Sequence, residues 1–95
     1  MPHGKSRHQI LEEQRRKPKA EQRKHWNKAV ASVWRQARVD ADLSQAELAK
    51  ALGWGRDTVA DIEAGRRKVE LTDVILLATV VKLDPKKLFE RILLW

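Results

Sequence analysis

Four residues near the start of one short predicted helix are of types that read the edges of DNA base pairs. They are exposed positions, namely Arg56, Asp57, Ala60 and Asp61. An arginine matches the two acceptors that guanine presents in the major groove, and an aspartate accepts from the amino group of cytosine. An alanine contacts the methyl group of thymine. These residue types therefore predict base recognition by one helix face.

Each of the four side chains also has a simpler interpretation. Arg56 contacts either a guanine or a phosphate, and we favour the guanine. Asp57 either orients Arg56, accepts from cytosine, or only stabilises the positive end of the helix dipole. Ala60 either touches a methyl group or merely permits close approach. Asp61 is repelled by phosphates, so it either accepts from cytosine or pairs with a nearby arginine.

Two short helices joined by a tight turn must position these residues. Ser44 and Glu47 fit the S-x-x-E capping box at the start of the first helix, and Gly53 supplies the left-handed residue that ends it. Gly55 is a weaker N-cap for the second helix, which ends at Gly65. This is the pattern of a helix-turn-helix, whose second helix enters the DNA major groove.

Three further helices are predicted around this motif. Apolar residues at three- and four-residue spacing from Val30 to Ala37 mark one face of the first. The apolar run Leu71–Val81 fits a buried strand by composition, but no second run could pair with it, so we favour a central helix. Asp84 and Pro85 cap and begin the last helix. The first predicted helix starts near Ala20–Trp26 and runs to about Ala41. The others cover about Gln45–Leu52, Arg56–Ala64, Leu71–Val81 and Pro85–Trp95.

The composition narrows the classes of function. A chain of 95 residues allows one domain, and the absence of cysteine excludes disulfides and cysteine-ligated metals. His3, His8 and His25 lack metal-binding spacing, and no nucleophile–base pair is present, so we expect no metal, no cofactor and no enzyme. Apolar runs are too short to cross a membrane. We expect a cytoplasmic protein.

Positive charge is concentrated at the start of the chain. Residues 1–28 carry nine Lys or Arg against three Glu, whereas residues 29–95 carry eleven basic and ten acidic residues, within a total net charge of +7. We predict a basic, partly disordered arm over residues 1–25 and a helix-turn-helix domain over residues 26–95, with a short helix near Gln9–Lys17. The arm either contacts nucleic acid or is a solvated tail. If it contacts DNA, deletion of residues 1–19 lowers affinity and flattens its salt dependence.

From about Trp34 to Phe89 the chain resembles the phage-repressor and Cro type (XRE-like) helix-turn-helix family. Three stretches carry the resemblance: LSQAELAKALG at 43–53, TVADIEAGRR at 58–67 and LDPKKLF at 83–89. The resemblance implies an all-α, five-helix DNA-binding domain that is commonly dimeric and regulates transcription.

The resemblance also implies roles for individual residues. Arg38 pairs with Glu63, because a guanidinium makes two parallel bonds to a carboxylate and locks two helices together. Gln45 contacts a phosphate at the start of its helix. Asp42 and Gly55 depart from the glycine and the serine or threonine that are common in the family. Apart from the resemblance, four more side chains are candidates for phosphate contacts, and each is equally well explained as a solvated side chain: Thr58, Arg66, Arg67 and Lys68.

Three functions remain at this stage. We favour a sequence-specific regulator of transcription. Because so short a chain leaves no room for a separate ligand-sensing domain, repression by a dimer bound to a palindromic operator of double-stranded DNA is the simplest mechanism. The alternative is an antitoxin or adaptor that binds a protein partner through the apolar residues 92–95. The third is an architectural protein dominated by the basic arm. The C-terminal patch either folds back on the first helix or forms a homodimer contact, and we favour the dimer.

Overall fold

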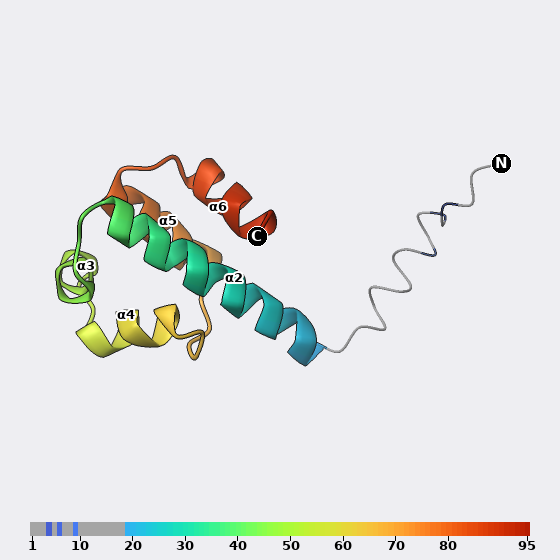
Figure 1. Cartoon of the computed structure of the whole chain (residues 1–95), viewed down its shortest axis with the longest axis horizontal. Coiled ribbons are helices and arrows are strands. Elements are labelled where there is room, and N and C mark those ends of the chain that lie inside the picture. Colours follow the sequence, from blue (N-terminus) through green and yellow to red (C-terminus); the bar gives the residue numbers. More distant parts are fainter. Residues whose placement is uncertain (1–3, 5, 7–8, 10–18) are drawn as a thin grey trace.

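The computed structural model describes residues 4, 6, 9 and 19–95. Within them the fold is all-helical, as predicted (Figure 1). The helices are α2 (Lys19–Asp40), α3 (Gln45–Leu52), α4 (Arg56–Glu63), α5 (Leu71–Val81) and α6 (Pro85–Leu93). The predicted disorder of the arm and its short helix near Gln9–Lys17 fall mostly outside the described residues. Ser6 and Gln9 do exchange two bonds of capping-box type, from the amide of each to the side chain of the other.

The core forms around α2, against which α4, α5 and α6 all pack. The predicted stripe is buried: Val30, Trp34 and Ala37 are each 1% exposed. Helix α2 begins at Lys19, close to the early end of the predicted start near Ala20–Trp26, so residues 19–25 of the predicted arm are helical. Burying the stripe holds one long helix as the scaffold for the shorter ones.

The apolar segment Leu71–Val81 is the helix that we favoured, but it is not buried on all sides. Val74 and Leu77 are 1% exposed, whereas Leu71 and Ile75 are 54% and 44% exposed. The expectation of a central helix was therefore wrong. The physical reason is size, because a domain this small has too few helices to surround one of its own. Lys82 ends α5 in the left-handed conformation at φ 58°.

The last helix begins as its cap predicted. The Asp84 carboxylate accepts from the amide of Lys86 at 3.0 Å, and Pro85 occupies the first turn. Leu88 and Ile92 are buried against the core, whereas Leu93 and Leu94 beyond them are 63% and 85% exposed. The C-terminal end of α6 therefore leaves an uncovered apolar surface.

Candidate nucleic-acid interface

Helices α3 and α4 form the predicted helix-turn-helix. The Ser44 hydroxyl accepts from the amide of Glu47, and the Glu47 carboxylate accepts from the amide of Ser44, each at 3.0 Å. Hydrogen bonding from Ser44 to the Glu47 carboxylate, mainly from the backbone amide of Ser44 and secondly from its side chain, lowers the pKa of Glu47. Gly53 is left-handed at φ 75°, and Gly55 caps α4 without a side-chain bond. Both ends of the turn are thus defined by the residues that the sequence indicated.

Aromatic stacking holds the turn against the scaffold. Trp54, between α3 and α4, stacks on Trp34 of α2 with ring centroids 6.1 Å apart and an interplanar angle of 12°. Leu48 and Val59, which begin the inward faces of the two helices, are fully buried. The orientation of α4 is therefore set by packing as well as by the turn.

An ion pair fixes the other end of α4. The Arg38 Nε donates to Glu63 Oε2 at 2.7 Å, and its Nη2 donates to Oε1 at 2.9 Å. A third bond runs from Nη1 to the carbonyl of Leu43 at 2.7 Å. The bond to Glu63 raises the pKa of Arg38, against an opposing effect of burial. The predicted pair is present, and it joins α2, the turn before α3 and the C-terminal end of α4.

The same turn shows how one departure from the family is accommodated. Asp42 occupies the position where glycine is common, and it adopts the left-handed conformation at φ 58°. Aspartate is among the few residues that tolerate this region. The chain can therefore pass from α2 to α3 without glycine.

Gln45 makes a contact that the sequence did not reveal. Its Nε2 donates to Glu63 Oε1 at 3.3 Å, and the residue is half-buried. It joins the Arg38–Glu63 pair from the first position of α3. No local pattern in the sequence signals this contact, because only the folded chain brings residues 45 and 63 together.

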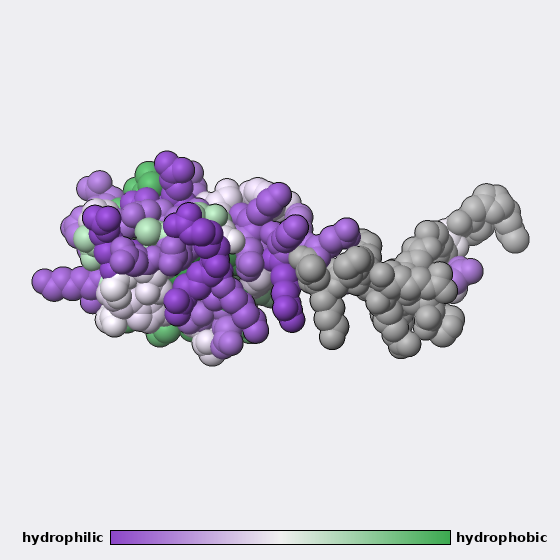
Figure 2. Space-filling view, turned by 90° about the horizontal axis from the view of Figure 1, so that it is seen from below, coloured by the Kyte–Doolittle hydropathy of each residue, from purple (hydrophilic) through white to green (hydrophobic). Residues whose placement is uncertain are grey.

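The outer face of α4 presents most of the predicted base-contacting side chains. Arg56 and Asp57 are exposed, and Ala60 and Asp61 are partly exposed. No ion pair within the described residues engages Arg56. Because the ends of α4 are fixed, these positions belong to a rigid surface. Seen from the α4 side, that surface is mostly hydrophilic (Figure 2).

Asp61 adopts one of the two roles considered for it. Arg66 Nη2 lies 2.9 Å from Asp61 Oδ1, and a second bond from Nε to the same oxygen measures 3.3 Å. The two side chains are 44% and 69% exposed, so the pair contributes little to stability. Arg66 is therefore anchored beside α4.

The loop after α4 is also tied to α2. Trp26 Nε1 donates to the carbonyl of Val69 at 3.1 Å, and the indole lies 6.2 Å from the ring of Phe89. Arg67 and Lys68, just before this contact, are exposed, whereas Thr58 on α4 is partly buried. The sequence did not predict this hydrogen bond, because it joins residues that are 43 positions apart.

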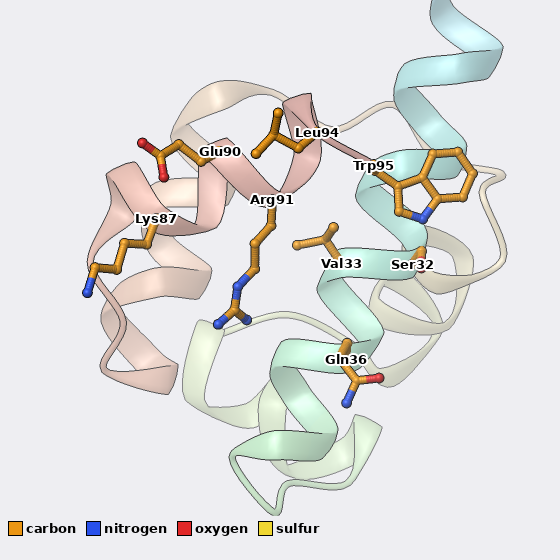
Figure 3. A pocket seen from close by; sticks show the side chains of 8 residues that line it. All are labelled: Ser32, Val33, Gln36, Lys87, Glu90, Arg91, Leu94 and Trp95. Carbon is orange, nitrogen blue, oxygen red and sulfur yellow. The ribbon is translucent and has the colours of Figure 1, made fainter.

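A pocket of about 560 Å³ lies between α2 and α6 (Figure 3). Arg91 extends into it from α6, and Val33 contributes from α2. At its end Trp95 lies back against α2, with its ring centroid 5.8 Å from that of His25. Trp95 is still 51% exposed. The C-terminus thus folds back against α2 and still leaves apolar surface exposed.

The described residues contain no cluster of three or more His, Cys, Asp or Glu arranged to hold a metal ion. In the same part of the chain, no helix has the length and apolar character needed to span a bilayer.

Comparisons with known proteins agree with this geometry. A family model described as a helix-turn-helix domain matches residues 31–89. The restriction-modification controller protein C.AhdI from Aeromonas hydrophila is 33% identical at a TM-score of 0.60, covering 67% of this chain and 96% of that one. The hypothetical transcription factor NHTF from Neisseria is 27% identical at a TM-score of 0.61, covering 73% and 84%. No curated protein sequence matches.

Proposed function

The chain belongs to the helix-turn-helix domain family, and we propose that it is a sequence-specific DNA-binding regulator of transcription. The observation that carries the proposal is the outer face of α4, where Arg56 and Asp57 are exposed on a helix held at both ends. A helix so held can enter the major groove without losing its orientation. Similarity to a restriction-modification controller favours that class of regulator.

Within this proposal, α4 reads bases and its surroundings bind the DNA backbone. Arg56 contacts a guanine, and Asp57 orients it or accepts from a cytosine. Ala60 permits close approach to the groove, and Asp61 holds Arg66 near the adjacent phosphates. The further phosphate contacts are Gln45, Thr58, Arg66, Arg67 and Lys68.

We infer that two copies bind one palindromic operator and repress by excluding polymerase. In this arrangement the α4 helices of the two subunits enter successive major grooves about 34 Å apart. Selection of bound sequences from random double-stranded DNA tests the proposal. We expect a two-fold symmetric motif with half-sites about one helical turn apart. Recovery of no motif would refute sequence-specific regulation.

The exposed end of α6 is the proposed dimer contact. Replacing Leu93 and Leu94 together by serine is expected to shift the protein from dimer to monomer in sedimentation at micromolar concentration, because it removes exposed apolar surface without opening the core. The matched control replaces Leu71 and Ile75, which are similarly exposed on α5, by serine. A dimer that survives the first change would exclude this contact.

The same apolar end favours a second candidate, an antitoxin or adaptor that binds another protein. Leu94 is 85% exposed, and the acidic residues of α4 are unfavourable near phosphates. This candidate predicts binding of a protein partner through residues 92–95 and no motif in the DNA selection. The two candidates are thus separated by the same experiment.

A further inference from the structure

Helix α2 begins well before the core requires it. Its first buried side chain is that of Ala29, whereas residues 21–25 are all exposed. The segment carries Arg23 and Lys24 as exposed cations, with Glu21 as its acid. We call residues 19–25 the α2 extension. None of residues 21–25 is buried, and His25 contacts the ring of Trp95 at the exposed C-terminus, so the core does not require this part of the helix and its charges are the feature to be explained.

The extension is connected to the basic loop that follows α4. Trp26, directly after the extension, donates its indole N–H to the carbonyl of Val69. Arg67 and Lys68 precede Val69 immediately and are exposed. This bond brings the loop against α2 directly after the extension, although the two bonded residues are 43 positions apart in the sequence.

Helix periodicity places the two cations on the side of α2 that faces the helix-turn-helix. Lys24 and Arg38 are fourteen residues apart, about four turns, so they lie on nearly the same stripe. Arg38 points to Glu63 at the end of α4. Arg23 precedes Trp34 by eleven residues, about three turns, and Trp34 stacks on Trp54 in the turn.

The figures agree with this placement. The start of α2 projects beyond the bundle and descends to the same edge of the molecule as α4 and the loop after it (Figure 1). In the view from that edge, hydrophilic side chains continue from the region of α4 to the projecting start of α2 (Figure 2).

We propose that the α2 extension, together with the loop Arg66–Lys68, binds DNA phosphates that flank the half-site on the side of the C-terminal end of α4. The proposal rests on the proposed function and extends its footprint. Because phosphates are the same in every sequence, Arg23 and Lys24 contribute to affinity and salt dependence, not to base preference.

The test replaces Arg23 and Lys24 together by glutamine in the full chain. Glutamine favours helices and both positions are exposed, so the fold is retained. The matched control, Lys82→Asn with Lys86→Gln, removes one charge from the end of α5 and one from the first turn of α6, at the opposite edge from α4 (Figure 1). Asparagine is suited to the left-handed backbone of residue 82.

The affinity of each protein is measured as a function of salt concentration on three duplexes. These are the selected site with long flanks, the same site cut at the outer ends of its half-sites so that the flanks are absent, and an unrelated sequence. We expect the R23Q/K24Q variant to lose about fivefold in affinity for the flanked site. Its salt slope should fall by roughly 1.8 per bound subunit, or about 0.9 for each lost phosphate contact. On the trimmed site the R23Q/K24Q variant and the parent should bind with equal affinity. The control variant should have the affinity and salt slope of the parent on all three duplexes.

The outcomes separate this proposal from the proposed function. Equal slopes for the variant and the parent on flanked DNA, or an equal loss in the control, would overturn the role of the extension while leaving sequence-specific binding intact. Conversely, equal affinity of the parent for selected and unrelated DNA would refute the proposed function. A reduced slope of the variant on unrelated DNA would still support the phosphate contacts.

Discussion

Replacing Arg38 by alanine is expected to lower the free energy of unfolding by about 3 kcal/mol, because it strands a buried carboxylate. Glu63 is 5% exposed in its side chain and would keep only the bond from Gln45. For a domain of this size, the loss corresponds to a fall in Tm of roughly 12 °C or more. Thermal and urea unfolding followed by circular dichroism measure it.

Two comparisons test whether the stranded charge is the cause. Arg66→Ala breaks the exposed pair with Asp61 and is expected to cost under about 1 kcal/mol. Replacing both partners of the buried pair, Arg38→Met with Glu63→Leu, should recover much of the stability lost by Arg38→Ala, since no unpaired charge remains. Equal losses for Arg38→Ala and Arg66→Ala would contradict a stabilising role for the buried pair.

Replacing Arg56 by alanine is expected to relax base preference at one base pair of each half-site. An arginine bound to guanine contributes about 1–3 kcal/mol of discrimination, so the preference there should fall by roughly 5- to 150-fold. Arg56 is exposed at the start of α4, so its removal leaves the core unchanged. Selection from random DNA, followed by affinity measurements on duplexes changed at that position, gives the result.

Arg67→Ala supplies the matched control for this prediction. Arg67 is exposed on the loop after α4 and is proposed to contact a phosphate. Its loss should weaken binding to all sequences about equally and reduce the salt slope by roughly 0.9 per subunit. If Arg56→Ala behaves in the same way, with the preference intact, Arg56 contacts a phosphate and not a base.

Some contacts were accessible to sequence reasoning only through a resemblance. The Arg38–Glu63 pair spans twenty-five positions, and nothing in local periodicity requires it. The family pattern indicated both residues, and the structure brings them together with two bonds. The partner of Asp61 was one of two alternatives, because Arg66 is near in sequence but a DNA base competes for the same carboxylate.

The sequence by itself determined the helices and their ends. The capping box of Ser44 and Glu47, the left-handed Gly53 and the Asp84–Pro85 start are each made within a few residues, so local chemistry is sufficient to specify them. The apolar stripe of α2 likewise follows from periodicity alone.

Only the tertiary structure decided which residues meet across the fold. It brought Gln45 to Glu63 and Trp26 to Val69, and it left Leu71 and Ile75 of α5 uncovered. These outcomes depend on how few helices share one small core and on the angles at which they pack, which no local pattern encodes. The candidate interface therefore combines a locally encoded helix α4 with a setting that arises from contacts distant in sequence.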